Sequence, residues 1–149
     1  MQNKLKIKKA GKDDLSALLE LYTYLNDDPP QEITARVKKI YLSVLNDKNN
    51  NILLGHIGDK LVSSCTIIII KNLTRNQRPY ALIENVVTHA EYRNRGFASA
   101  LLGRACEIAK KNNCYKIMLL TGSKKEGTLR FYENCGFNRA DKTGFVKWL

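Results

Sequence analysis

The residues with the clearest chemical potential lie in the stretch RNRGFAS, residues 93–99. In the pattern Arg93-x-x-Gly96-x-Ala98 the side chains at the last two positions are absent or small. Such positions let a diphosphate approach the backbone closely. If a helix begins here, the N–H groups of its first turn have no partner inside the helix and carry the positive end of its dipole. The stretch therefore predicts an anion site formed by the amides of residues 94–99.

An ordinary turn before a helix is the alternative to this anion site. The pattern RxxGxA is short and arises often by chance, and its arginines are compatible with solvated surface positions. The two better-defined phosphate loops, GxxxxGK[ST] and GxGxxG, do not occur in the sequence. The neighbouring elements are therefore needed to choose between the two interpretations.

Metal and thiol chemistry have weaker support in this sequence. There is no CxxC motif, and neither histidine lies at metal-ligand spacing from a cysteine. We therefore expect no metal site and reduced, structural thiols, although a Cys–His pair that meets only in space stays open. The residues concerned are Cys65, Cys106, Cys114, Cys135, His56 and His89.

Hydrophobic periodicity predicts the elements that position these residues. Apolar and alternating runs predict strands at 5–9, 52–57, 61–70, 80–88, 115–120 and 145–149. Apolar residues at helical spacing predict helices over 13–25, 33–45, 98–109 and 128–134. The mid-chain strands are expected to pair as antiparallel hairpins, and the strand–helix–strand unit over 80–120 is expected to form a right-handed crossover between parallel strands. This order predicts a mixed sheet with helices on both faces.

Composition narrows the classes of function. A chain of 149 residues is expected to form one domain. The net charge of +11 suits an anionic partner, which would be a nucleic acid, a membrane surface or a phosphorylated small molecule; a basic surface without such a partner is the alternative. There is no long basic tail, no run of the roughly 18 apolar residues that a membrane span needs, and no apolar signal-peptide core near the first residues. We expect a cytoplasmic protein.

Three segments occur in an order and spacing that carry a family resemblance. They are IENVVTHAEY at 83–92, RNRGFASALL at 93–102 and RFYENCGF at 130–137. In these segments the sequence resembles the Gcn5-related N-acetyltransferase (GNAT) superfamily. The match runs from about residue 80 to residue 137, and residues 1–50 are similar to the family's first strand and helix pair more loosely.

The resemblance implies an α/β (α+β) fold of the acyl-CoA N-acyltransferase type, as a single domain over residues 1–149. Its sheet is mixed and mostly antiparallel, with a central parallel pair and helices on both faces. It implies acetyl-CoA as the cosubstrate and direct transfer of the acetyl group to a primary amine, without a covalent enzyme intermediate. By position, the backbone of residues 86–88 would bind the pantetheine arm and the amides of residues 94–99 the pyrophosphate. The implied cosubstrate-binding residues are Val86, Val87, Thr88, Arg93, Asn94, Arg95, Gly96, Phe97, Ala98, Ser99 and Lys125.

Two catalytic residues follow from the same resemblance. Tyr132 would be the general acid that protonates the leaving thiolate of CoA, and a tyrosine pKa of about 10 beside a thiol pKa of about 8.5 suits that transfer. The Val87 N–H would stabilise the developing oxyanion. Glu84 is the candidate base, because it interrupts an otherwise apolar strand and glucosamine-phosphate acetyltransferases of the superfamily carry a similar acid there. Core packing beside Phe131 is the alternative for Tyr132, and a solvent-facing position is the alternative for Glu84.

The sequence departs from the family pattern before the tyrosine. Where the family often has an asparagine that contacts the cofactor, this chain has Lys125. We expect Lys124, Lys125 or Arg130 to reach the phosphates of CoA, with a solvated loop as the alternative for each. Arg93 is expected to pair with a nearby acid.

Several acceptors and functions stay open at this point. A small-molecule amine is the leading acceptor, and a protein N-terminus or lysine is the alternative. Asp27 and Asp28 would attract a cationic amine, or simply end a helix. A non-catalytic CoA-binding regulatory module is a further alternative. We expect no nucleic acid and no membrane as partners, and the resemblance leaves a homodimer open through a strand edge or the C-terminal segment.

Overall fold

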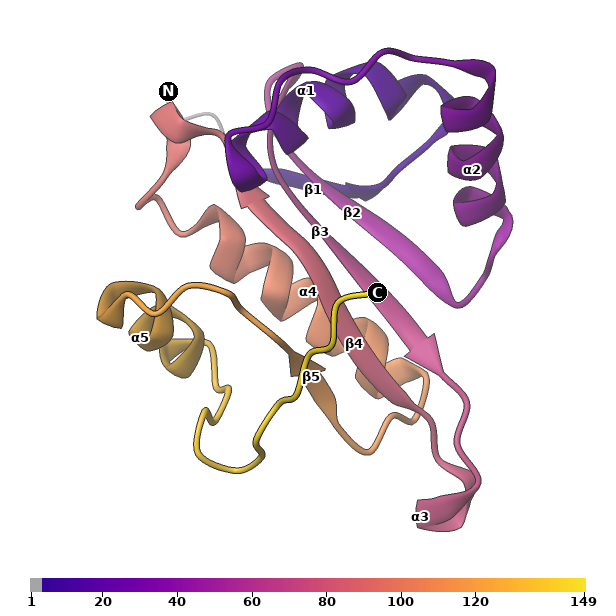
Figure 1. The fold of residues 1–149 in the computed structure, drawn as a ribbon, viewed down its shortest axis with the longest axis vertical. Helices are drawn as coiled ribbons and strands as arrows, with labels where there is room; N and C mark the ends of the chain where they lie inside the picture. Colours follow the sequence, from indigo (N-terminus) through magenta and orange to yellow (C-terminus); the bar gives the residue numbers. More distant parts are fainter. Residues whose placement is uncertain (1–3) are drawn as a thin grey trace.

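The fold is built on one five-stranded sheet in the order β1-β2-β3-β4-β5 (Figure 1). The structure is a computed structural model that describes residues 4–149. The first four strands are antiparallel to their neighbours, and β4 and β5 run parallel. The predicted mixed sheet with one parallel pair is therefore confirmed. The strands are β1 (Lys6–Lys9), β2 (Asn50–Ile57), β3 (Lys60–Ile70), β4 (Tyr80–Thr88) and β5 (Ile117–Leu119).

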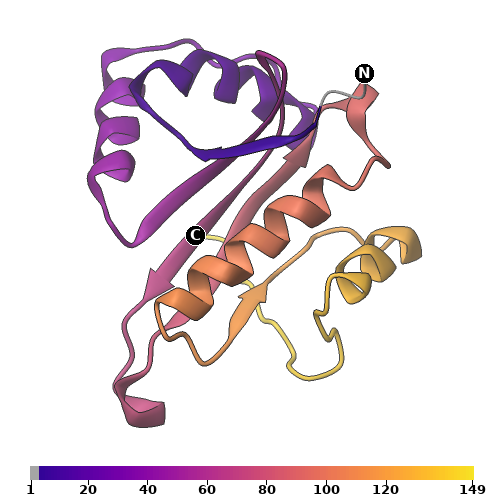
Figure 2. The ribbon, with the colours of Figure 1, turned by 180° about the vertical axis from the view of Figure 1, so that it is seen from behind.

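Helices cover both faces of this sheet. Helices α1 and α2 pack on one face, and α4 crosses the other, which Figure 2 shows from behind. Short 3-10 turns precede α1 and α4, at Lys12–Asp14 and Ala90–Tyr92. The α-helices are α1 (Leu15–Asn26), α2 (Ala35–Asn46), α3 (Thr74–Gln77), α4 (Phe97–Lys111) and α5 (Glu126–Asn134).

Each face of the sheet carries its own hydrophobic core, because successive strand residues point to opposite faces. On the α4 face, Ile67 and Ile83 pack against Leu101 and Leu102 of the helix. On the other face, strand residues such as Leu54 pack against α1 and α2. The two cores hold the sheet and α4 in fixed relative positions, and the loop that begins α4 is held with them.

A β-bulge in β4 changes which face its residues occupy. Cys65 of β3 stands opposite two residues of β4, Asn85 and Val86, and Asn85 has a left-handed φ of 52°. Such a bulge adds one residue to a strand and bends it. Ile83 before the bulge lies in the core beside α4, whereas Val87 after it lies in the core beside α1.

The parallel pair is short. The ladder between β4 and β5 covers only Ala81–Ile83 and Ile117–Leu119, so β4 continues to Thr88 without β5 as a neighbour. This separation of the two parallel strands, at the carboxyl end of β4, is where the candidate site lies.

The predicted last strand is wrong. Residues 145–149 are not part of the sheet, and the side chains of Phe145 and Trp148 are each 91% exposed. In Figures 1 and 2 this C-terminal segment crosses the sheet face opposite α4 and does not extend the edge of β5. At Gly144 the backbone runs against Leu120, and a Cβ there would lie 2.7 Å from the Leu120 side chain. A strand needs a neighbour for its N–H and C=O groups, and this path provides none.

Candidate active site

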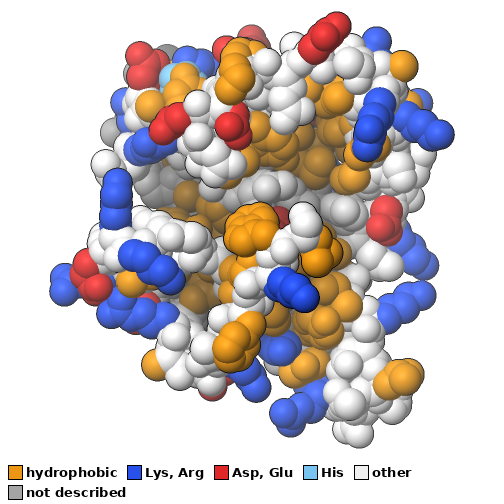
Figure 3. Space-filling view, in the orientation of Figure 1, with side chains coloured by type: hydrophobic (Ala, Val, Ile, Leu, Met, Phe, Trp, Pro, Cys, Tyr) orange, Lys and Arg blue, Asp and Glu red, His pale blue; other side chains and the backbone are white. Residues whose placement is uncertain are grey.

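A cleft of about 620 Å³ opens beside the end of β4. In Figure 3 a hollow lies between the part of the molecule formed by α1 and α2 and the part that carries α5. Four segments line the cleft: the end of α1, the end of β4, the loop that leads into α4, and α5. Their lining residues are Tyr24, Leu25, Val86, Val87, Thr88, Tyr92, Arg93, Asn94, Gly96, Phe97, Ala98, Ser99, Gly127, Thr128, Phe131 and Tyr132.

The loop into α4 presents a row of backbone donors to this cleft. Asn94 and Gly96 have left-handed φ angles of 60° and 77°, and α4 begins directly after the glycine. The first intrahelical bond runs from the Ala100 N–H to the Gly96 oxygen, at 3.0 Å. Within residues 4–149, the N–H groups of residues 94–99 donate to no protein acceptor. A Cβ placed on Gly96 would meet nothing within 4 Å, and residues 94 and 96–99 line the cleft. The geometry could hold an anion.

The two arginines of this loop bind backbone oxygens. Arg93 donates from Nε to the Thr88 carbonyl at 3.2 Å and from Nη2 to the Tyr24 carbonyl at 3.5 Å. The acid partner that we expected for Arg93 is therefore replaced by two carbonyl groups, which link the end of β4 to the end of α1. Arg95 donates to the Glu91 carbonyl at 2.9 Å, and its guanidinium lies 5.0 Å from the ring centre of Tyr92. Its side chain does not line the cleft.

Tyr132 lies on the α5 wall of the cleft. Its ring packs against Phe131, with centroids 4.9 Å apart, and against Phe137, at 6.3 Å. Its hydroxyl makes no hydrogen bond to any of the residues that the structure describes. Burial raises the pKa of Tyr132, so the phenol is protonated at neutral pH. A protonated, unpartnered phenol in a cleft can serve as a proton donor.

Three of the predicted site residues lie outside the cleft lining. Glu84 is exposed and stands one residue beyond Ile83, so it points to the face of α1 and α2. Lys125 is exposed directly before α5, and Arg95 is turned toward Tyr92. The other predicted residues meet in the one cleft: residues 86–88, 93, 94 and 96–99, and Tyr132.

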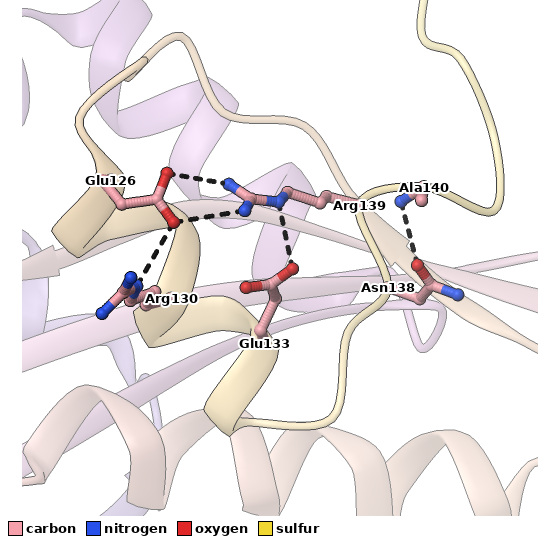
Figure 4. Close-up of polar contacts among 6 residues, drawn as sticks. All are labelled: Glu126, Arg130, Glu133, Asn138, Arg139 and Ala140. Carbon is pink, nitrogen blue, oxygen red and sulfur yellow. Dashed lines mark hydrogen bonds and ion pairs between the residues drawn. The ribbon is translucent and has the colours of Figure 1, made fainter.

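Ion pairs attach α5 to the chain that follows it (Figure 4). Arg139 makes two contacts of 3.2 Å with Glu126 and one of 3.0 Å with Glu133. Arg130 adds a bond of 3.3 Å to Glu126, so the residue expected near the CoA phosphates is held by an acid of its own helix. The Ala140 N–H donates to the Asn138 side chain at 2.9 Å (Figure 4). These pairs lower the pKa of Glu126, Arg139 first and Arg130 second.

The cleft also contains residues that the sequence did not single out. Tyr24 and Leu25 close it on the α1 side, and Gly127 and Thr128 on the α5 side. In the sequence Tyr24 lies beside the apolar stripe of its helix and carries no motif. Asp27, by contrast, ends α1 with a left-handed φ of 54° and does not line the cleft, which agrees with the helix-ending alternative.

The described residues contain no cluster of metal ligands and no disulfide. Among residues 4–149, no three His, Cys, Asp or Glu side chains lie together as metal ligands would. All four cysteines are free thiols, and burial raises the pKa of Cys65 to about 12, which keeps it protonated. Nor is any helix in this described range long and apolar enough to span a bilayer.

Comparison with known proteins decides the family. Residues 17–137 match the family described as "Acetyltransferase (GNAT) family". The chain belongs to the GNAT family. GNAT enzymes use acetyl-CoA as cosubstrate, and this chain is an N-acetyltransferase of that family.

Relatives and solved structures agree with the GNAT assignment. The glucosamine 6-phosphate N-acetyltransferase of Trypanosoma brucei brucei is 28% identical over 144 residues, which cover 93% of this chain and 92% of that protein. A putative acetyltransferase from Agrobacterium tumefaciens is 40% identical, with a TM-score of 0.91, covering 97% of this chain and 99% of that one. The glucosamine-6-phosphate N-acetyltransferase of Arabidopsis thaliana shares the fold, with a TM-score of 0.84 at 20% identity over 97% of this chain and 98% of that one.

Proposed function

We propose that this GNAT enzyme transfers the acetyl group of acetyl-CoA directly to the primary amine of a small molecule, within a ternary complex. One observation carries the proposal. Among residues 4–149, the N–H groups of residues 94–99 and the phenol of Tyr132 have no partner, and the loop and the tyrosine line the same cleft. A thioester whose carrier bears a diphosphate needs both: the N–H groups can bind the diphosphate, and the phenol can lie near the leaving thiolate.

The cosubstrate would lie along the end of β4. Its diphosphate would accept hydrogen bonds from the amides of residues 94–99, where the left-handed Gly96 leaves the backbone accessible. Its pantetheine arm would pair with the backbone of residues 86–88, which lie beyond the last β5 contact at Ile83. Lys125 at the start of α5 would reach the outer phosphates as a long-range cation.

The chemical step needs one proton acceptor and one proton donor. The amine nitrogen attacks the thioester carbonyl carbon. Val87 is paired with Ser64 of β3, so a backbone N–H on the edge of β4 that faces away from β3 is the proposed donor to the oxyanion. When the C–S bond breaks, the electron pair goes to sulfur, and Tyr132 donates its phenolic proton there. The raised pKa of Tyr132 keeps that proton in place until the sulfur becomes basic.

Glu84 is the proposed acceptor for the proton that the amine must lose. It stands next to the bulge at Asn85 and points to the α1 face, so it is near the carboxyl end of β4 without lining the cleft. We therefore propose that the proton reaches Glu84 through water.

A phosphorylated amino sugar is the acceptor class that we favour. Support comes from the T. brucei relative, which is named for glucosamine 6-phosphate, and from a net charge of +11 that suits an anionic substrate. The test is release of CoA thiol from acetyl-CoA with matched acceptors: glucosamine 6-phosphate, glucosamine, and peptides with a free N-terminus or a lysine. We expect the highest kcat/KM with the phosphorylated sugar. A preference for a peptide would replace the small-molecule acceptor, and no thiol release with any amine would overturn the catalytic proposal.

A homodimer is also part of the proposal. The C-terminal residues Phe145, Trp148 and Leu149 are apolar and almost fully exposed, which is unusual for a monomer surface. Figure 3 shows hydrophobic side chains gathered at the centre of this face. Sedimentation of the full chain and of a chain ending at residue 144 tests the homodimer. We expect the full chain to be a dimer and the shortened chain to be a monomer. A monomeric full chain would contradict the proposal.

A further inference from the structure

A tyrosine–histidine pair joins the end of α1 to the end of β4 at the rim of the cleft. The Tyr24 Oη lies 3.1 Å from the His89 Nε2, and the two ring centres are 4.6 Å apart. Tyr92 contacts the imidazole edge-on, at 5.4 Å between centres and 89° between planes. His89 thus contacts two aromatic rings, and its Nε2 lies within hydrogen-bond distance of the Tyr24 hydroxyl.

The hydrogen bonds of His89 define its protonated nitrogen. The Glu91 N–H donates to His89 Nδ1 at 3.3 Å, so Nδ1 carries no hydrogen. A neutral imidazole then has its hydrogen on Nε2. That N–H donates to the Tyr24 oxygen, and the hydroxyl hydrogen of Tyr24 is left for another acceptor. Among the described residues the Tyr24 hydroxyl has no second partner, and Tyr24 lines the cleft.

Tyr24, which carries this free O–H, and the anion-binding loop line the same cleft. Arg93, the first residue of the loop, binds the backbone oxygens of both Tyr24 and Thr88. The end of α1 is therefore fixed against the segment that presents the amides of residues 94–99. A donor at this place can add to those amides around one anion.

We propose that Tyr24 is a cosubstrate-binding residue whose O–H donates to a diphosphate oxygen of acetyl-CoA, and that His89 is the positioning residue that directs this proton. The chain of donors runs from the Glu91 N–H to His89, from His89 to Tyr24, and from Tyr24 to the cosubstrate. The inference rests on the proposed binding of acetyl-CoA in this cleft. It adds a side-chain donor to the backbone donors of the loop.

Calorimetric titration of the full chain with CoA tests the role of Tyr24. Tyr24→Phe should weaken CoA binding by about ten- to a hundredfold, the range for a hydrogen bond to a charged group. Binding of pantetheine, which lacks the diphosphate, should be equal in the two proteins. Because Tyr24 would contact a non-reacting part of the cosubstrate, KM for acetyl-CoA should rise while kcat stays the same. Tyr115→Phe, at a tyrosine outside the cleft, is the matched control and should bind CoA as the wild type does.

Variants of His89 test the positioning role. His89→Ala should weaken CoA binding, and the double variant with Tyr24→Phe should lose no more than Tyr24→Phe alone, because His89 acts only through that hydroxyl. His89→Gln, whose amide nitrogen can replace Nε2 as a donor, should restore most of the affinity. NMR of the ring nitrogens gives an independent readout, with Nε2 protonated and Nδ1 bare.

Each contrary outcome overturns a defined step. If the wild type does not bind CoA, the proposed function fails and the inference with it. If the wild type binds CoA and Tyr24→Phe binds it equally well, only the inference fails. If Tyr24→Phe raised only the KM of the amine, Tyr24 would bind the amine substrate and not the cosubstrate. A hydrogen on Nδ1, or additive losses of affinity in the double variant, would show that His89 does not position Tyr24.

Discussion

The two sides of β4 differ in how completely they are paired. Toward β3, pairing extends from Tyr80 to Thr88 and is interrupted only at the bulge, whereas toward β5 it covers Ala81–Ile83 alone. The β3 side is continuous with the two hydrophobic cores, and most residues of β3 are buried, from Leu61 to Ile67 and at Ile69. On the β5 side, neither β5 nor α5 contains a fully buried residue. We call these the closed side and the open side.

The groups that stabilise the fold and the groups proposed for the chemistry lie on different sides of β4. Burial of apolar area is the main stabilising contribution to a fold, and it is concentrated on the closed side. The free N–H groups and the free phenol that chemistry needs lie where β4 has lost its neighbour. A ligand bound across the cleft would contact both sides and stabilise α5 against the sheet.

The largest expected effect is on activity, from a change on the open side. Tyr132→Phe removes the proposed proton donor and should lower kcat by about 10²–10⁴-fold, the usual contribution of a general acid. The free energy of unfolding should change little, because the ring and its contacts with Phe131 and Phe137 remain. Steady-state thiol release and urea denaturation measure the two quantities, with Tyr115→Phe as the matched control. Full activity across the pH range would remove Tyr132 from the mechanism.

The next effect is on stability, from a change on the closed side. Leu102 is 1% exposed in the core beside α4, and Leu102→Ala should cost about 2–5 kcal/mol of unfolding free energy. Leu120, which is 55% exposed after β5, is the matched position on the open side, and its change to alanine should cost about 0.5 kcal/mol or less. Equal losses at the two leucines in urea denaturation would contradict the division into two sides.

Prediction from sequence was most successful on the closed side, where the pattern repeats locally. The predicted range 80–88 matches β4 residue for residue, and the four isoleucines at 67–70 lie in β3. The mostly apolar segment FVKWL also predicted a strand at 145–149, but such a segment becomes a strand only beside a partner. Whether a partner strand lies beside the segment depends on the tertiary structure, which the residues of the segment alone do not determine.

The candidate site was predicted only where a local motif exists. The loop at 93–99 and Tyr132 have such motifs, and the structure brings both to one cleft. The bulge at Asn85 determines which face of the sheet Val87 occupies relative to Glu84. It depends on the register with β3, so the sequence of β4 alone did not predict it. Tyr24 meets His89 across 65 residues of sequence, and no periodicity could have paired them.

A smaller effect is expected at the loop between the two sides. Gly96→Ala places a side chain at a φ of 77°, which strains an L-residue by about 1–2 kcal/mol and favours a different loop conformation. Since a Cβ there meets nothing within 4 Å, strain rather than a clash is the cause. We expect CoA binding to weaken by about tenfold in calorimetric titration.

Gly103, in the interior of α4, is the matched glycine for this test. Its Cβ position is also open, but its backbone is helical. Gly103→Ala should therefore stabilise the protein by up to about 1 kcal/mol and leave CoA binding unchanged. If both alanine variants bound CoA like the wild type, the loop at Gly96 would not need its left-handed conformation to hold the ligand.

The smallest effect is expected at the exposed ion pairs that attach α5 to residues 138–140. Arg139 holds the pKa of Glu126 below its ordinary value, so the pair stabilises the folded state above the ordinary glutamate pKa of about 4.3 and loses that effect as the pH falls through the folded value. Arg139→Gln should therefore reduce the hydrogen-exchange protection of α5 at pH 7, and the difference from the wild type should disappear in acid. Arg104→Gln removes an exposed pair within α4 and should leave α5 protection unchanged. If the Arg139 effect were the same at acid and neutral pH, packing rather than charge would attach α5 on the open side.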